Sequence, residues 1–387
     1  MKKNILLLVV CCLVSCVSAQ RFDIKFNLDG HLRECIIVKP PTAPPKGGYP
    51  VVFMLHGTSG DGKKFFDISG WKELGIKENF ITVFPTSLSW CFVDEGREKN
   101  LTRWVNGNVT GNPCSGPPQK YVDDIKFLKK LVTLLSDTVS VNSAQIFACG
   151  FSNGSAMIHK MAMDAGDVFA AVAGSSGPLT VQDSIIPPVN RIPIWFMVGS
   201  MDTVFLRQSF KELPYGRDSI ITYLGPMLNR ALACQGLKQT FVFSETSTSH
   251  IYTFNETLTG GISKSPYVFS LNKGQSHEFP NGINDTLVAA EVIWDFFKQS
   301  TASTSKIHNQ HLEVLSIYPN PCGSYINVKT DDELFFNVFD SNGKLIRSGK
   351  LDNKKLSMED LSLGVYYVKL YNDRKLVCKK IIKTNNF

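Results

Sequence analysis

Short apolar runs alternate with helix-like patterns over most of the chain. Apolar side chains recur with helical spacing between residues 125 and 135, and a last helix is predicted over about residues 285–298. Apolar strands that alternate with helices are typical of a mostly parallel sheet covered on both faces. The pattern therefore predicts an α/β fold, with strands over residues 51–55, 80–84, 146–149, 169–173 and 194–198.

The last quarter of the chain has a different pattern, in which apolar and polar residues alternate. This period of two covers residues 325–328, 335–339 and 365–370, with an Asn342-Gly343 turn, and predicts a small antiparallel β-sandwich. The two regions are separated by small polar residues from Ser300 to Lys306. We therefore predict a first domain over residues 20–299, a linker over 300–312 and a second domain over 313–387.

The first residues have the pattern of an export signal. Lys2 and Lys3 precede an apolar run, and small residues end at Ala19, which predicts a signal peptide over residues 1–19. The apolar run is too short for a spanning anchor, so no transmembrane segment is predicted after cleavage. As an alternative, residues 13–16 resemble a bacterial lipobox, in which Cys16 would be lipidated.

The charge of the first domain is close to balanced. The chain has 41 Lys and Arg against 34 Asp and Glu, but the excess lies at the two ends. Residues 306–387 hold 13 basic and 9 acidic side chains and residues 1–19 hold two Lys, which leaves 26 against 25 between them. A balanced surface lacks the electrostatic footprint of a nucleic-acid-binding protein, so we predict no nucleic-acid partner.

The cysteines suggest an oxidising compartment and no metal site. Signal cleavage leaves seven cysteines, so at least one is unpaired within the chain, and Cys149 at the end of an apolar strand is the expected free one. Pairing of Cys91 with Cys114 and of Cys322 with Cys378 is plausible. Cysteine spacing of the zinc type and an HExxH motif are both missing, so we predict neither a metal nor a cofactor.

The main chemical motif is Gly150-Phe151-Ser152-Asn153-Gly154, a G-x-S-x-G that follows a predicted strand and precedes a predicted helix. In that context the motif forms a sharp turn that presents the serine at a helix N-terminus. We predict that Ser152 is a nucleophile. The alternative is an ordinary turn serine.

A nucleophilic serine needs a base, and the base needs a carboxylate that fixes its tautomer. Asp202 is the predicted acid, since it lies just beyond the predicted strand 194–198. His277 is the predicted base, because it lies in a loop between a strand-like run and the last helix. The alternatives are a turn-forming aspartate and a surface histidine.

Backbone amides next to the nucleophile are the expected stabilisers of a negative oxygen. Thr58 follows the first predicted strand and Asn153 follows Ser152, so their amides are the predicted oxyanion hole. Trp90 and Trp104 lie in a Gly- and Asn-rich segment and could stack on a substrate ring. Packing beneath a long loop is the alternative for both.

Taken together, these residues resemble secreted feruloyl and acetylxylan esterases and polyhydroxybutyrate depolymerase-like proteins, over about residues 25–298. The resemblance implies an α/β-hydrolase fold with Ser152, Asp202 and His277 as its triad. Two features depart from the family: residues 274–280 read GQSHEFP where GGGHxWP is common, and the downstream cysteine that would usually follow the family cysteine Cys234 is not found in the sequence. The other motifs that carry the resemblance are residues 55–58, 71–85, Trp104 with Asn106 and Gly107, Cys114 with Gly116, 122–124 and 199–202.

The resemblance implies a secreted serine esterase that hydrolyses feruloyl or acetyl esters on plant cell-wall polysaccharide. A polyhydroxyalkanoate depolymerase-like esterase is the alternative enzyme. A surface carbohydrate-binding protein that has lost catalysis is the alternative outside enzymes, and it would be expected to lack a triad residue.

The C-terminal region strongly resembles the sorting domain of type IX secretion cargo in Bacteroidetes. The features in question are Tyr318-Pro319-Asn320-Pro321, the Leu-x-x-Gly-x-Tyr pattern over 361–366 and the basic end at 379–383. The resemblance implies export through the type IX machinery to the medium or cell surface. A carbohydrate-binding β-module is the alternative for the domain, and a periplasmic protein or lipoprotein for the location.

Overall fold

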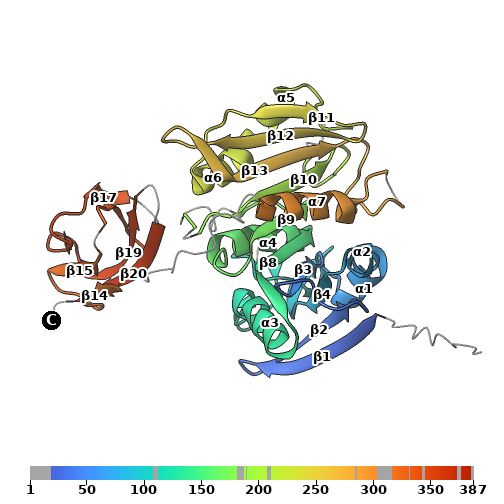
Figure 1. Cartoon of the computed structure of the whole chain (residues 1–387), viewed down its shortest axis with the longest axis horizontal. Coiled ribbons are helices and arrows are strands. Elements are labelled where there is room, and N and C mark those ends of the chain that lie inside the picture. The colour runs from blue at the N-terminus through green and yellow to red at the C-terminus, as the bar shows by residue number, and fades with distance from the viewer. Residues whose placement is uncertain are drawn as a thin grey trace, which may run out of the picture.

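The computed structural model describes residues 19–107, 112–180, 187–188, 190–206, 211–283, 286–302, 316–330, 332–341, 345–372 and 376–384. Its largest element is a ten-stranded sheet in the order β1-β2-β4-β3-β8-β9-β10-β13-β12-β11 (Figure 1). The strands are β1 (Gln20–Leu28), β2 (His31–Lys39), β3 (Tyr49–Leu55), β4 (Ile81–Thr86), β8 (Val141–Phe151), β9 (Ala171–Ser175), β10 (Ile194–Gly199), β11 (Val242–Glu245), β12 (Ser249–Glu256) and β13 (Ile262–Asn272).

The middle of this sheet is parallel and its two edges are antiparallel. Strands β4, β3, β8, β9, β10 and β13 pair in parallel, while β1, β2, β11 and β12 join by antiparallel pairs. The prediction of a mostly parallel sheet is therefore confirmed. Because the central strands run the same way, their carboxyl ends meet at one edge, where loops collect functional groups.

Helices cover both faces of the sheet (Figure 1). One face is buried under α3 (Asp124–Thr138), α4 (Asn153–Asp164) and α6 (Gly225–Gln235), which share a core with Phe53 and Phe196. The other is buried under α1 (Gly62–Ile68), α2 (Trp71–Glu78) and α7 (Ala289–Ala302), which share a core with Phe147. A short helix, α5 (Ser219–Tyr223), precedes α6. Strands buried on both faces explain why β3 reads as a continuous apolar run.

The last helix ends later than the sequence pattern predicts. Helix α7 continues to Ala302, so the first residues of the predicted linker are helical. Thr301 is buried, and its hydroxyl bonds back to the Phe297 carbonyl, which keeps this polar residue inside the helix. The rest of the predicted linker, 303–312, and the predicted signal peptide with its lipobox, 1–18, lie outside the described residues.

A small sheet is formed by the chain segment between β4 and α3. It consists of β6 (Arg97–Thr102), β5 (Ser89–Asp94) and β7 (Asn112–Pro113), in that order. A disulfide between Cys91 and Cys114 joins it to the following loop, with 5.5 Å between the Cα atoms, so that predicted pairing is confirmed. The Cys149 thiol is free and buried, as predicted.

The C-terminal region forms two antiparallel sheets. One has the order β14 (Ser316–Tyr318), β15 (Tyr325–Lys329), β18 (Lys355–Ser357), and the other β17 (Leu345–Lys350), β16 (Phe335–Phe339), β19 (Gly364–Tyr371), β20 (Leu376–Lys383). Ile326 of the first sheet and Val368 of the second belong to one buried core. The predicted β-sandwich is thus confirmed, while its Asn342-Gly343 turn lies outside the described residues.

The proposed link between Cys322 and Cys378 does not form in this sandwich. Cys322 is a buried free thiol, and its backbone forms a β-bridge with Lys383 at the end of β20, whereas Cys378 lies earlier in β20, opposite Lys369 of β19. The side chain of Cys378 itself is not among those described.

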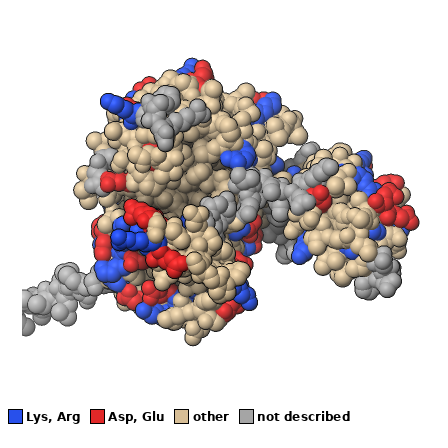
Figure 2. Space-filling view, turned by 180° about the vertical axis from the view of Figure 1, so that it is seen from behind, with Lys and Arg blue, Asp and Glu red and all other residues tan. Residues whose placement is uncertain are grey.

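Basic and acidic side chains intermix on the face shown in Figure 2. Near β1, Arg21 pairs with Asp23, and Lys25 pairs with Glu34. Within the described part of the chain, the helices are all too short or too polar to cross a bilayer.

Candidate active site

Ser152 lies at the turn between β8 and α4, at the carboxyl edge of the sheet. Its backbone has φ 51° and ψ −119°, an unusual conformation for a residue with a side chain, and its amide donates to the Ser175 carbonyl at 2.8 Å. Gly154 leaves no space for a side chain, since a Cβ there would lie 2.5 Å from the His56 carbonyl oxygen. The predicted sharp turn is therefore present, and it raises Ser152 at the start of α4.

His277 reaches Ser152 from the loop that follows β13. Its Nε2 atom lies 3.2 Å from the Ser152 Oγ, and its side chain is 28% exposed. The buried Gln275 fixes this loop, since its amide donates to the Glu278 carbonyl at 2.9 Å and accepts from Asn272 at 2.7 Å. The ring is thus held at the serine while one side stays open to solvent.

Asp202 approaches the other side of the imidazole. Its Oδ1 lies 2.9 Å from the His277 Nδ1, and the side chain is fully buried. The same oxygen accepts from the Val204 amide at 3.0 Å, which fixes the carboxylate. A carboxylate at Nδ1 favours the tautomer that carries its proton there, so Nε2 is left with the lone pair that faces Ser152.

A second group of polar contacts joins the loops that carry Asp202 and His277. The buried Ser200 hydroxyl donates to Glu212 at 2.7 Å and accepts from the Gly274 amide at 2.8 Å and from Tyr215 at 2.5 Å. The Met201 amide also donates to the Gln275 carbonyl at 2.9 Å. Sequence reasoning missed this network, because Ser200 and Gly274 are 74 residues apart and all of its members are ordinary residue types.

The predicted oxyanion donors lie on two adjacent segments. Thr58 belongs to the exposed turn after β3, and Asn153 is the first residue of α4. In the described part of the chain neither amide bonds to a backbone carbonyl, so both can bind another acceptor. A Cβ on Gly57 would lie 3.2 Å from the Ser152 Cβ, which shows how closely the turn approaches the serine.

His56 holds the turn that precedes Thr58. The ring is completely buried, its Nδ1 lies 2.7 Å from the Gly57 carbonyl oxygen, and its Nε2 accepts from the Ser87 amide at 3.0 Å. Burial lowers the pKa of His56 to about 4, so the ring is neutral at neutral pH. A neutral ring with one donor and one acceptor matches these two partners.

The stacking prediction for the two tryptophans is corrected. Trp104 is fully buried, and Trp90 is 7% exposed and packs against Tyr121 in a T-shaped arrangement. Both indole N–H groups are used inside the protein: Trp104 donates to the His56 carbonyl at 2.9 Å, and Trp90 to that of Arg103 at 3.0 Å. Neither ring offers a free face, so packing beneath the loop is the reading that fits.

A cavity of about 330 Å³ opens beside the site instead. It extends from Thr58 and His277 toward α1. Its apolar wall is formed by Phe65, Phe151 and Phe279, whose ring centroids lie 5.8–6.3 Å apart. Sequence reasoning missed these three rings, although Phe151 belongs to the serine motif. Lys64 and Glu278 also line the cavity, and both are exposed.

Two other histidines that follow Ser152 in the sequence lie away from it. His159 is fully buried in α4, where burial lowers its pKa to about 4, and His250 contacts Glu245 on the antiparallel edge of the sheet. His308 and His311 lie outside the described residues.

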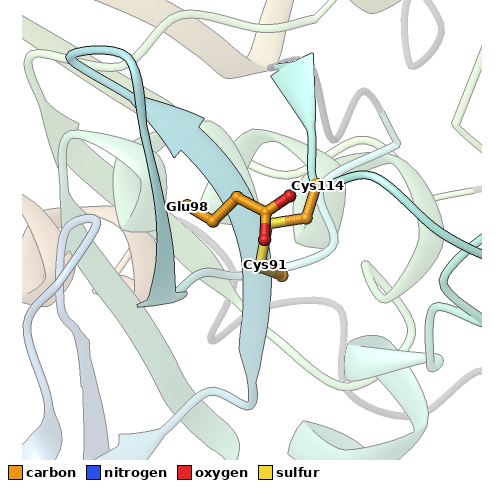
Figure 3. A group of neighbouring side chains, drawn as sticks. All are labelled: Cys91, Glu98 and Cys114. Atoms are coloured by element: carbon orange, nitrogen blue, oxygen red, sulfur yellow. A yellow bond between two sulfur atoms is a disulfide. The ribbon is translucent and has the colours of Figure 1, made fainter.

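One cluster with metal-ligand chemistry occurs among the described side chains, and it consists of Cys91, Glu98 and Cys114 (Figure 3). The two sulfurs form the disulfide, so neither is available as a thiolate ligand. Glu98 accepts a hydrogen bond from the Ser115 amide at 2.9 Å. The cluster therefore closes a loop and does not offer a metal site.

Comparison with known families identifies the end of the chain. Residues 316–384 match the family model described as "Secretion system C-terminal sorting domain". The chain ends in a sorting domain. This confirms the predicted type IX sorting domain, and such a domain indicates a secreted or cell-surface protein.

No curated protein matches the chain in sequence. Among solved structures, the chain is similar to an acetyl xylan esterase from Aspergillus awamori, at 13% identity and TM-score 0.44, over 72% of this chain and 99% of that one. An S-formylglutathione hydrolase from Agrobacterium tumefaciens matches at 11% identity and TM-score 0.46, over 74% and 96%. The feruloyl esterase module from Clostridium thermocellum, complexed with sinapinate, matches at 11% and 0.44, over 76% and 92%.

Proposed function

We propose that the chain is an exported serine esterase that hydrolyses carboxylic esters through an acyl-enzyme on Ser152. The observation that supports this most directly is the continuous contact from the Ser152 Oγ through the His277 ring to the buried Asp202, at 3.2 and 2.9 Å. A strained serine at a helix N-terminus, with two unused amides beside it, is the arrangement that acyl transfer needs.

In the first half of the reaction, the Ser152 Oγ attacks the ester carbonyl carbon while the His277 Nε2 takes the hydroxyl proton. The carbonyl π electrons move onto oxygen, and the Thr58 and Asn153 amides donate to the resulting oxyanion. When the tetrahedral intermediate collapses, the bond to the alcohol oxygen breaks and His277 returns the proton to that oxygen. Asp202 stabilises the transient imidazolium and keeps its proton at Nδ1.

In the second half, water attacks the acyl carbon and His277 takes a proton from it. Collapse of the second intermediate breaks the bond to the Ser152 Oγ, which recovers its proton from His277. The net change is one ester and one water converted to one acid and one alcohol. The open side of His277 gives water access to the ring.

We propose feruloyl or acetyl esters on plant cell-wall polysaccharide as the substrates. The cavity next to Thr58 and His277 supports an aromatic acyl group, because Phe65, Phe151 and Phe279 provide an apolar wall for a flat ring. An acetyl group would fill little of this space. A short-chain polyhydroxyalkanoate is the alternative substrate, since its ester units are flexible and their apolar parts could lie against the same wall.

The domain plan follows from the same proposal. Residues 1–19 act as a signal peptide, residues 20–299 form the esterase domain, and residues 313–387 carry it to the secretion machinery. The partners of the chain are thus an ester substrate and that machinery. The alternatives that stay open for the location are a periplasmic protein and a lipoprotein anchored at Cys16.

Hydrolysis assays on purified residues 20–387 test the proposal, with p-nitrophenyl acetate, methyl ferulate, acetylated xylan and 3-hydroxybutyrate oligomers as substrates. The wild type should hydrolyse p-nitrophenyl acetate and methyl ferulate, and Ser152→Ala should not. Inactivity of the wild type on every substrate would favour a carbohydrate-binding protein without catalysis. Activity confined to the hydroxybutyrate oligomers would favour the alternative enzyme.

A further inference from the structure

The segment from Thr102 to Val105 lies between the two backbone segments that carry the proposed oxyanion donors, and it contacts both of them. One of these segments is the turn from His56 to Gly60, and the other is the start of α4 at Asn153. The position of one amide relative to the other therefore depends on what this segment holds.

The Asn153 side chain holds the segment at two points. Its Oδ1 accepts a hydrogen bond from the Trp104 amide at 2.6 Å, and its Nδ2 donates to the Trp104 carbonyl at 3.3 Å. The side-chain amide thus bonds to both the N–H and the C=O of one residue, as the backbone of a neighbouring β-strand would. Asn153 is only 8% exposed, so water does not compete freely for these bonds.

The Trp104 indole extends the connection to the other donor. Its N–H donates to the His56 carbonyl, and the centroids of the indole and imidazole rings lie 5.1 Å apart. His56 in turn contacts the Gly57 carbonyl, which belongs to the same peptide group as the Thr58 N–H. A chain of direct contacts thus runs from the start of α4 to the turn that carries Thr58.

The segment itself is anchored on its far side. The Val105 amide donates to the buried Asp124 at 2.8 Å, and that carboxylate is paired with the buried Arg33 at 2.6 Å. Thr102 adds two bonds to the turn, because its hydroxyl donates to the Gly60 carbonyl at 2.5 Å and its carbonyl accepts from the Ser59 amide at 3.0 Å. Movement of the turn or of α4 would therefore break buried bonds.

We propose that Trp104 and the Asn153 side chain form a clamp that fixes the spacing between the Thr58 and Asn153 amides. Both are positioning residues, since neither side chain has to touch the substrate. The inference rests on the proposed function, in which these two amides receive the oxyanion. It also explains why a residue next to the nucleophile turns its side chain inward, away from the open site.

Two shape-preserving variants test the clamp, namely Trp104→Phe, which removes the indole N–H, and Asn153→Asp, which sets an oxygen against the Trp104 carbonyl. Trp195→Phe and Asn142→Asp are matched controls. The Trp195 indole bonds to Ser270 at 3.0 Å, and the Asn142 side chain also makes two hydrogen bonds, yet neither contacts the donor segments. All four variants are made in residues 20–387, and kcat and KM are measured with p-nitrophenyl acetate.

The decisive readout is the ratio of kcat/KM for p-nitrophenyl acetate to that for its thionoester, in which sulfur replaces the carbonyl oxygen. Sulfur is a poor hydrogen-bond acceptor, so the thionoester gains little from well-placed amides. We expect each test variant to lower kcat for the oxoester by about 10- to 100-fold, less than outright loss of a donor, with KM nearly unchanged. The ratio should fall by a similar factor, because the thionoester rate changes little.

General loss of folded protein would lower both rates together and leave the ratio unchanged. An unchanged ratio in either test variant, whether or not kcat falls, would therefore overturn the positioning role of that residue. The controls should keep the wild-type ratio and kcat. A wild type as inactive as Ser152→Ala on both esters would overturn the proposed function itself, and this inference with it.

Discussion

The Gly274 amide donates a hydrogen bond to the Ser200 hydroxyl at 2.8 Å, and this contact joins the loop that carries Asp202 to the loop that carries His277. Glu212 and Tyr215 complete the contacts of the same hydroxyl. The acid and the base of the proposed triad are therefore connected twice, directly through the imidazole and indirectly through Ser200.

Ser200→Ala tests the importance of the indirect connection. The substitution leaves the Gly274 amide with only the Tyr215 hydroxyl at 3.2 Å, so the loop of His277 should be held less firmly. We expect kcat on p-nitrophenyl acetate to fall by roughly 10-fold and the free energy of unfolding to fall by about 1–3 kcal/mol. Ser300→Ala is the matched control, because the Ser300 hydroxyl donates a hydrogen bond to the Phe296 carbonyl within α7. Equal kcat in both variants would contradict a positioning role for Ser200.

Two buried histidines should make the fold sensitive to acid. Burial lowers the pKa of both His56 and His159 to about 4, whereas an unfolded histidine titrates near 6.5. Between these values the unfolded chain binds protons that the native chain excludes, so stability is full above pH 6.5 and is lost as the pH falls toward 4. Each histidine contributes a slope of up to about 1.4 kcal/mol per pH unit in this window.

Urea unfolding at several pH values between 7 and 4.5 measures this slope, and His159→Gln isolates the part of one histidine. The glutamine amide can still bond to the Ser155 carbonyl that the ring contacts at 2.9 Å. The variant should lose less stability than the wild type on acidification. A slope equal to that of the wild type would rule out His159 as a source of the effect.

The Cys91–Cys114 disulfide should stabilise the loop from residue 91 to 114, which contains Trp104. It joins residues 23 apart in the sequence, so it restricts the unfolded chain over a moderate loop. We expect a double Cys91→Ser, Cys114→Ser variant to lose about 2–4 kcal/mol of unfolding free energy. Thermal or urea unfolding with and without dithiothreitol checks this. The reductant should bring the wild type to the level of the variant and leave the variant unchanged, and a shift in the variant would point to another cause.

Deletion of residues 313–387 tests the role of the sorting domain in export. In a native host with a type IX system, the shortened chain should stay in the periplasm, because the proposed signal peptide would carry it across the inner membrane only. Cell fractionation with an immunoblot measures its location. Full-length Ser152→Ala is the control and should be exported like the wild type. Undiminished export of the shortened chain would contradict a sorting role.

The meeting of Ser152, Asp202 and His277 follows from sequence reasoning because each lies directly after a strand. The central strands β8, β10 and β13 are parallel, so their carboxyl ends converge at one edge although the residues are 125 and 75 positions apart. Strand periodicity and turn residues carry that information along the chain. The same holds for the sandwich, whose alternating pattern directly reflects one buried and one exposed face.

The orientation of single side chains is not encoded in such local patterns. Trp104 was expected to face a substrate, yet its indole points inward, where the His56 carbonyl accepts a hydrogen bond from the indole N–H. The end of α7 depends likewise on the burial of Thr301. The apolar wall at Phe65 and Phe279 comes from elements more than 200 residues apart, and only their packing reveals it.

At Gly154, where a side chain would collide with the His56 carbonyl, the two halves of the chemical machinery touch main chain to main chain. The geometry of the proposed oxyanion hole is therefore set by contacts between backbone segments. By contrast, the wall of the neighbouring cavity is built from side chains alone. In the proposed esterase, replacing Phe65 or Phe279 should change which acyl group fits the cavity, whereas Phe151 also packs against the His277 ring, with 5.1 Å between the ring centroids.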